Sequence, residues 1–240
     1  MLYEKLKSEL RKICEQHNWL REKIEVTARA LTAEESIGRP SHDDYPLLKG
    51  KESMVEAVFL GARGHAFTDM PGNFAGTVED VISLPTENNF ERCIFISTLN
   101  AVLRRAGMIG KTVHCKDDEP VECAEKLAEH IAEEFGRPKI FQVGLQPRMA
   151  EKLSERFELR VVDLDKDNVG KKAGNASVQP EDSTAENIDW CDLVLATGTT
   201  IVNDTAQQFI DSGKPVIFYG VTSAGAAHIL DLPRFCYCAK

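Results

Sequence analysis

A series of short apolar runs in the second half of the chain limits the fold more than any other feature. Four runs rich in β-branched and aromatic residues are separated by segments with helical character, and they cover residues 140–143, 159–162, 192–196 and 215–219. Runs of this length that alternate with helices are typical of a parallel sheet with crossover connections. We therefore predict an α/β fold, a Rossmann-like mostly parallel sheet with helices on both faces.

The first part of the chain follows a different pattern. Leucines at helical spacing predict a helix over residues 2–17, whereas alternating polar and apolar residues predict a strand over 23–31 and one or two strands over 52–69. A few mixed elements of this kind are typical of a small α+β unit. We predict a small α+β domain over residues 1–87, followed by the Rossmann-like domain over 88–240.

Local signals predict three further helices and a candidate strand. Thr77 precedes two acidic residues and is positioned to cap a short helix at 78–84. Helices are expected over 88–107 and up to Gly136, where a glycine follows the last turn. The segment 111–115 is a candidate for an additional strand.

Composition excludes several classes of function. The formal net charge of −9 argues against binding to nucleic acid. No apolar run reaches the roughly 18–20 residues that a membrane helix needs, and the charged N-terminus does not resemble a secretory signal. Seven dispersed cysteines fit a reducing compartment better than a disulfide framework. We expect a cytoplasmic protein without membrane or nucleic-acid partners, and a homo-oligomer is compatible with the sequence.

Two turns that follow predicted strands combine glycine with hydroxyl side chains. Parallel strands present their carboxyl ends at one edge, where α/β proteins bind ligands. Small residues there let a ligand approach the backbone, and the N–H groups of a following helix favour an anion. The candidates for binding a polar or anionic ligand are Thr197, Gly198, Thr199, Thr200, Asn203, Thr205, Gly220, Thr222 and Ser223. The alternative is that these residues only cap helices and form turns.

The turns after the first two predicted strands bear on whether the ligand is a nucleotide. Asp163 follows the second strand about twenty residues after Gly144, where an acidic residue binds a ribose hydroxyl in many nucleotide-binding folds. The turn "GLQP" at 144–147 has a single glycine, however, so an NAD site is not expected. A nucleoside-like or pterin-like ligand remains open, with Gln146 as a further candidate contact, and so does a purely structural role for Asp163.

Histidine and cysteine suggest a second kind of site. His114 and Cys115 are adjacent, and Cys236 and Cys238 lie two apart, on one face if that segment is a strand. These are ligands for soft metal ions, so a metal cofactor is one hypothesis, although the spacing C-x-x-C is absent. Burial of the cysteines in the core is the alternative.

Charged residues also gather in the predicted loops of the first domain. If these loops fold over the sheet edge, they supply acid, base or anion-binding groups, with Arg63 as the candidate that closes the cleft. Simple solvation is the alternative. The residues are Arg39, His42, Asp43, Asp44, Arg63, His65 and Asp69.

Four motifs together resemble a known family, the one named for "putative heavy-metal chelation". They are "VGLQP" (143–147), "CDLVLATGTTIVNDT" (191–205), "STLNAVL" (97–103) and "FYGVTSAG" (218–225). The resemblance implies an enolase-N-terminal-like α+β domain joined to a Rossmann-like domain, with a site between them. It implies roles for Asn100, Gly144, Pro147, Thr197, Gly198, Thr199, Asn203 and Thr205. The family's glycine-proline-threonine is here Gly220-Val221-Thr222.

These observations leave three hypotheses. The resemblance implies chemistry around metal chelation, or condensation or hydrolysis in the synthesis of pterins, flavins or siderophores. The leading hypothesis is therefore a site in the interdomain cleft for a small pterin-, flavin- or siderophore-like, metal-chelating ligand. The rivals are a non-catalytic metal-binding or carrier protein that uses His114 and the cysteines, and an enzyme-like scaffold in an assembly.

Overall fold

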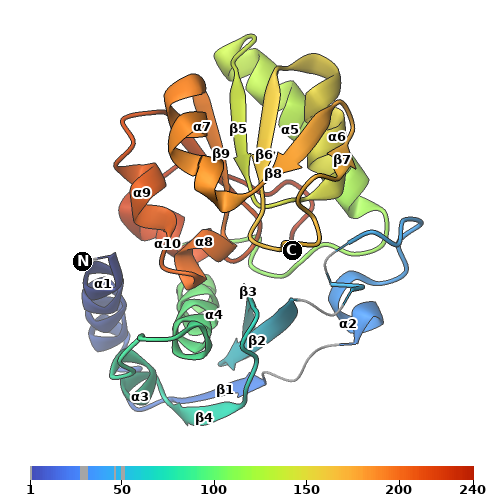
Figure 1. Cartoon of the computed structure of the whole chain (residues 1–240). Coiled ribbons are helices and arrows are strands. Elements are labelled where there is room, and N and C mark those ends of the chain that lie inside the picture. The colour runs from blue at the N-terminus through green and yellow to red at the C-terminus, as the bar shows by residue number, and fades with distance from the viewer. Residues whose placement is uncertain (1, 28–31, 46, 50–51) are drawn as a thin grey trace.

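The chain forms a larger and a smaller sheet, and one long helix lies against the smaller sheet and next to helices of the larger unit (Figure 1). The structure is a computed structural model that describes residues 2–27, 32–45, 47–49 and 52–240. In this part of the chain, no helix is long and apolar enough to cross a membrane.

The larger sheet has the strand order β11-β10-β9-β5-β6-β8-β7. All neighbouring pairs are parallel except β7 and β8, which form an antiparallel edge. The strands are β5 (Ile140–Val143), β6 (Leu159–Val162), β7 (Lys172–Ala173), β8 (Ala176–Gln179), β9 (Leu193–Thr197), β10 (Val216–Tyr219) and β11 (Arg234–Phe235). The four strands predicted from the apolar runs are confirmed as parallel, whereas β7, β8 and β11 were not predicted. The chain reverses its direction of winding between β5 and β9, which is the position where Rossmann-type sheets bind ligands.

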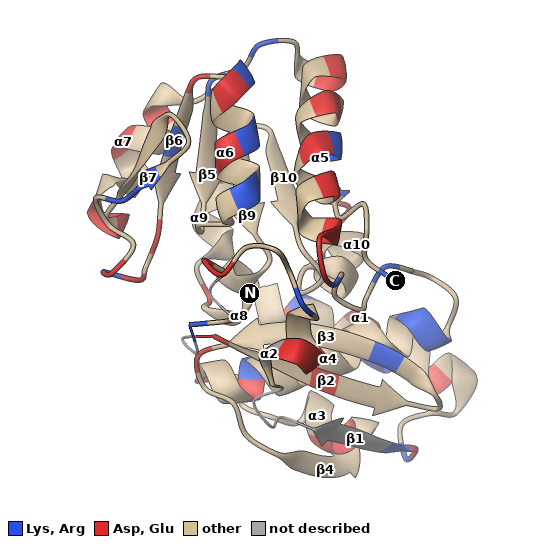
Figure 2. Ribbon diagram, turned by 90° about the vertical axis from the view of Figure 1, so that its right-hand side faces the viewer, with Lys and Arg blue, Asp and Glu red and all other residues tan. Residues whose placement is uncertain are grey.

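Helices cover both faces of this sheet, as predicted. Leu193 and Leu195 of β9 pack under α5 and α6, whereas Val194 and Ala196 point to the opposite face, toward α9 and α10. This alternation is the period of two that a strand imposes on its side chains. The covering helices are α5 (Glu119–Phe135), α6 (Pro147–Arg156), α7 (Thr184–Trp190), α9 (Ala206–Ile210) and α10 (Ala224–Leu230). Charged residues lie along the outer sides of α5 and α6 (Figure 2).

The smaller sheet is antiparallel, with the order β3-β2-β1-β4. Its strands are β1 (Lys23–Thr27), β2 (Ser53–Phe59), β3 (Ala62–Thr68) and β4 (Phe74–Thr77), and it carries the helices α1 (Leu2–His17), α2 (Ala33–Ile37) and α3 (Val78–Ile82). Leu60 and Gly61 both have positive φ, 45° and 80°, so 52–69 folds as a hairpin with a two-residue turn. Residues 28–31 of the predicted first strand lie outside the described residues.

The helix α4 (Asn89–Arg105) is enclosed on all sides. Every residue from Cys93 to Leu103 is buried. Its backbone touches β3 so closely that a Cβ atom on Gly64 would lie 2.3 Å from the carbonyl oxygen of Ser97. On other sides it contacts α10 and the short helix α8 (Thr199–Val202). One hydrophobic core therefore runs from the small sheet through α4 to the large sheet, and the domain boundary at 87/88 stays a prediction.

One predicted strand is absent from the structure, and one predicted helix cap is present. Thr77 forms a capping box with Asp80 at the start of α3, as expected. The segment 111–115 is no strand of either sheet. The carbonyl group of Thr112 accepts a hydrogen bond from His65 of β3, and the backbone of Val113 exchanges two with Lys240. Its extended shape therefore serves to join β3 to the C-terminal segment.

Candidate ligand-binding site

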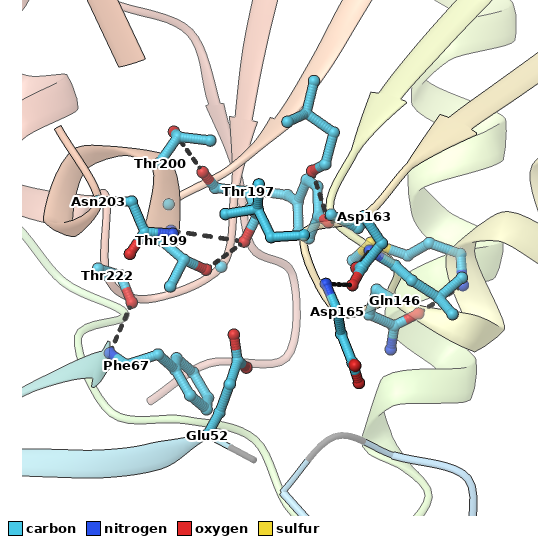
Figure 3. Close-up of a pocket in the computed structure, with 18 of the residues that line it drawn as sticks. Glu52, Phe67, Gln146, Asp163, Asp165, Thr197, Thr199, Thr200, Asn203 and Thr222 are labelled. Carbon is cyan, nitrogen blue, oxygen red and sulfur yellow. Dashed lines mark hydrogen bonds between the residues drawn. The ribbon is translucent and has the colours of Figure 1, made fainter. Parts of the chain in front are cut away.

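A cavity of about 770 Å³ lies where β5 and β9 end, between this edge of the large sheet and the near end of the small sheet. Figure 3 shows Glu52 and Phe67 of the small unit facing the Thr197–Thr200 turn across this space. Its volume is in the range of pockets that hold a cofactor-sized molecule. It is lined by most of the predicted ligand-binding residues: Gly144, Gln146, Asp163, Thr197, Gly198, Thr199, Thr200, Asn203, Thr205, Gly220 and Thr222.

The turn after β9 presents a set of linked hydroxyl groups to the cavity. The Oγ1 atoms of Thr197 and Thr199 lie 2.8 Å apart, and the Thr200 hydroxyl donates to the carbonyl oxygen of Thr197 at 2.7 Å. Because each hydroxyl has one donor and two acceptor positions, this set retains capacity to bind a ligand. The helix expected after this turn is divided at Asp204, whose φ of 59° ends α8 before α9 begins. Asn203 therefore ends the first helix, and Thr205 precedes the second.

Two glycines allow close approaches at this edge. Gly144 has a φ of 85°, and a Cβ atom there would lie 2.7 Å from the Cγ2 atom of Thr197. A Cβ atom on Gly198 would lie 2.6 Å from the backbone nitrogen of Ser223. Gly198 thus lets the turns after β9 and β10 touch each other. This differs from the expectation that Gly198 lets a ligand approach the backbone.

The turn after β10 is held by hydrogen bonds within the protein. Thr222 Oγ1 accepts from the backbone N–H of Phe67 at 3.1 Å, and the Ser223 hydroxyl donates to the Gly220 carbonyl at 3.2 Å. Asn100 is fully buried, and its amide nitrogen donates to carbonyl groups of His65, Val221 and Thr222. Its oxygen accepts from the N–H of Gly225. Neither Asn100 nor Ser223 lines the cavity, so their position indicates a structural junction.

The first turn of the Rossmann-like sheet is fixed by Asp163. One carboxylate oxygen accepts from the N–H of Leu145 at 2.6 Å, and the other accepts from Asp165 and Asn168. These three hydrogen bonds support the structural alternative for Asp163 over a ribose contact. Gln146 caps α6 by accepting from the N–H of Met149, and Pro147, buried at the first helical position, does not line the cavity.

Several lining residues carry no recognisable sequence signal. Six carboxyl side chains line the cavity, whereas no lysine or arginine does in the described part of the chain. These six are Glu52, Asp69, Asp163, Asp165, Glu181 and Asp182. Tyr45 is only 3% exposed, and its hydroxyl has no hydrogen-bond partner among the described residues. Only Asp69 and Asp163 were singled out from the sequence, because the others become neighbours through contacts distant in the chain.

The carboxyl group of Glu52 has a raised pKa. It precedes β2 and points into the cavity beside Phe67 (Figure 3). Burial raises its pKa to about 7, and repulsion from Asp163, Asp69 and Asp165 adds to this effect. It therefore exchanges a proton near neutral pH.

Arg63, predicted to close the cleft, lies elsewhere. It is exposed and pairs with Glu56, which also accepts from the Nε2 atom of His65 at 2.7 Å. Burial opposes ionisation of Glu56, but the hydrogen bonds from His65 and Arg63 outweigh it and hold the pKa at about 2. The other ring nitrogen of His65 accepts from the backbone N–H of His114 at 3.1 Å. This network supports the wall of the cavity from behind and does not line it.

The loop that follows α2 is fastened to the large domain by Arg148. This nearly buried guanidinium donates to His42 Nδ1 and to Asp44, both at 2.6 Å, and to Glu151 at 2.9 Å. Thus His42 and Asp44, two of the charged loop residues selected from the sequence, bind Arg148. This contact holds the neighbouring Tyr45 in the cavity wall.

The proposed metal ligands do not form a metal site. His114, Cys115 and Cys236 line the cavity, but Cys238 does not, and β11 ends before both C-terminal cysteines. Burial lowers the pKa of His114 to about 4, and it raises the pKa of Cys236 to about 11 and that of Cys238 to about 12. Among the described residues, no group of three or more His, Cys, Asp or Glu side chains is arranged to hold a metal ion. The donor set therefore does not fit a directly bound heavy metal.

The sheet order and the cavity at its winding reversal define a Rossmann-type α/β protein with an additional antiparallel unit. Residues 126–232 match the family model DUF364, described as "Putative heavy-metal chelation", so the resemblance drawn from the motifs is confirmed for this segment. Two solved structures, both of DUF364 proteins with unknown function, are similar in fold. The one from Pyrococcus horikoshii has a TM-score of 0.56 and 15% identity, covering 93% of this chain and 80% of that chain. The one from Desulfitobacterium hafniense has a TM-score of 0.52 and 14% identity, covering 74% and 72%. No curated protein matches the chain.

Proposed function

We propose that this protein binds a small polar organic molecule in the cavity between its two sheets. The observation that carries the proposal is the cavity of about 770 Å³ at the winding reversal of the sheet, lined by the hydroxyl turn after β9. Rossmann-type sheets bind their ligands at this position. Apolar walls with a few convergent polar groups are typical of sites for organic ligands.

The chemistry of the lining narrows the class of ligand. Thr197, Thr199 and Asn203 offer hydroxyl and amide groups that recognise a heterocycle with donors and acceptors at its edge. A pterin-like or flavin-like ring is such a heterocycle, and a siderophore-like chelator offers donors and acceptors of the same kind. Since the described side chains do not fit a bare metal ion, a metal would enter as a complex whose donors belong to the small molecule.

A mass-spectrometric experiment tests this function. Protein purified without an affinity tag is denatured, and the small molecules that it releases are identified and quantified. A matched pair of variants on α9 locates the site, because Gln208 lines the cavity whereas the adjacent Gln207 bonds to Asp211 and does not. We expect Gln208→Trp to lose the released compound and Gln207→Trp to retain it. Equal retention in both variants, or no compound in the wild-type protein, contradicts the proposal.

A further inference from the structure

The charges around the cavity are unbalanced. No lysine or arginine of the described chain lines it, although six carboxyl groups do. The one lining histidine, His114, is kept neutral near pH 7, because burial lowers its pKa to about 4. Among the described lining residues, a ligand that carries a carboxylate or phosphate would meet only like formal charges.

The carboxyl groups differ in what they already bind. Both oxygens of Asp163 accept backbone or side-chain hydrogen bonds, and Asp69 accepts from Asn89 at 2.8 Å. Glu52 has no hydrogen-bond partner among the described residues, and it reaches into the space between the Thr199 and Asp165 side chains (Figure 3). It is therefore one acceptor that a ligand can use without displacing a hydrogen bond between described residues.

A second observation also indicates a missing partner. Tyr45 lines the cavity, and its buried hydroxyl lacks a partner among the described residues, although the residue is only 3% exposed. Buried hydroxyl groups without a partner are rare, because desolvation without compensation is costly.

We propose that the ligand is an organic cation with N–H donors, an amine, amidine or guanidine, whose charged end binds Glu52 facing the Asp163–Asp165 turn. The inference rests on the proposed function, since it names the class of molecule that the same cavity takes. Carboxylate acceptors bind such groups through charge-assisted hydrogen bonds, which are stronger than neutral ones. The apolar walls, which include Phe67 and Leu145, suit a ligand with a ring or hydrocarbon body.

Three probes with the same phenyl ring and different charges distinguish the effect of ligand charge on binding from the effect of ligand shape. Benzamidine is a cation, benzamide is neutral and benzoate is an anion at pH 8. Binding of each probe to the full chain is measured by isothermal titration, and its location is mapped by amide NMR shifts in the Thr197–Thr200 turn. We expect benzamidine to bind at least about tenfold more tightly than benzamide, and benzoate to bind most weakly.

Two variants complete the design. Glu52→Gln is expected to weaken benzamidine binding by about five- to tenfold while leaving benzamide affinity within about twofold. Glu133→Gln, on the exposed side of α5 and with the same loss of charge, is expected to leave all three affinities unchanged. Asp69→Asn serves as a second cavity variant should Glu52→Gln fold poorly.

The outcomes distinguish the two proposals. Equal binding of the three probes in the cavity, tighter binding of benzoate, or an unchanged benzamidine affinity in Glu52→Gln overturns the cation inference and leaves the small-molecule function standing. Absence of any shift in the turn overturns the inference as well, and the released-ligand experiment then decides the proposed function by itself.

Discussion

The turns after β9 and β10 have similar sequences and different surroundings. Both combine glycine with threonine or serine at the end of a parallel strand. The turn at 197–200 bonds mainly within itself and faces the cavity. In the turn at 220–223, Thr222 accepts from Phe67 and two carbonyl groups accept from Asn100. The comparison teaches that small polar residues after a strand mark the carboxyl edge of the sheet, while the element that packs on this edge decides their role.

The largest expected effect concerns the junction at Asn100. Asn100→Ala removes four hydrogen bonds that link α4, β3 and the turn after β10, and it leaves buried backbone groups unpaired. We expect the free energy of unfolding to fall by about 3–5 kcal/mol, measured by chemical denaturation. The control is Asn175→Ala, an exposed asparagine with one side-chain hydrogen bond, for which we expect a loss below about 1 kcal/mol. Similar losses in both variants would mean that the junction does not depend on Asn100.

The contact between the two turns comes next. Gly198→Ala places a Cβ atom against the backbone of Ser223, so the turns must separate. We expect a loss of about 2–3 kcal/mol in thermal or chemical unfolding. Gly110→Ala is the matched control, because a Cβ atom there has no neighbour within 4 Å. An unaltered stability in Gly198→Ala would show that the turns are not held in contact.

The next prediction concerns Glu52 in the cavity, where removal of the ionisable group is expected to increase stability. The unfolded chain ionises Glu52 near its usual pKa of 4.5, whereas the folded protein holds the proton to about pH 7. Stability attributable to Glu52 therefore falls as the pH rises from about 4.5 to about 7, and the full cost persists above this window. We expect Glu52→Gln to raise the free energy of unfolding by about 1–3 kcal/mol at pH 8 and to change it little at pH 4. A difference between wild type and variant that does not vary with pH contradicts this assignment.

The smallest effect is expected from a matched pair of threonines. Thr222→Val leaves the N–H of Phe67 without its acceptor and is expected to cost about 1–2 kcal/mol. Thr199→Val loses a hydroxyl at the cavity surface and is expected to cost less than about 1 kcal/mol, because water can replace it. Denaturation curves should therefore show a larger loss of stability in Thr222→Val than in Thr199→Val. A larger loss in Thr199→Val would mean that the structural role belongs to the turn at 197–200.

Much of the fold follows from the sequence. Residues 140–143 and 193–196 are buried on both faces, so their apolar composition alone identified them as strands of a parallel sheet. The strand β11 has only two residues, and its pairing depends on β10, so no local sequence pattern predicts it. The segment at 111–115 has the composition of a strand, but it makes one backbone hydrogen bond to β3 and two to Lys240, and it is no strand of either sheet.

The site was less predictable than the fold. Thr197 and Gly144 were found because the carboxyl ends of parallel strands gather at one edge. Glu52 was not found, since a single acidic residue before a strand is common, and its raised pKa depends on Asp163 and Asp165, far along the chain. Arg63 was selected from the sequence but does not line the cavity, and its guanidinium pairs with Glu56 on the neighbouring strand.

The central position of α4 also constrains the order in which a chain emerging from the ribosome can bury its apolar surface. The small sheet precedes α4 in sequence, so this helix can cover β2 and β3 as soon as it has been synthesised. Its remaining sides contact α8 and α10, which are synthesised near the end of the chain. In a nascent chain that stops between α4 and α8, the sides of α4 that contact α8 and α10 are therefore uncovered. Exposed apolar surface of this kind is bound by chaperones and promotes aggregation.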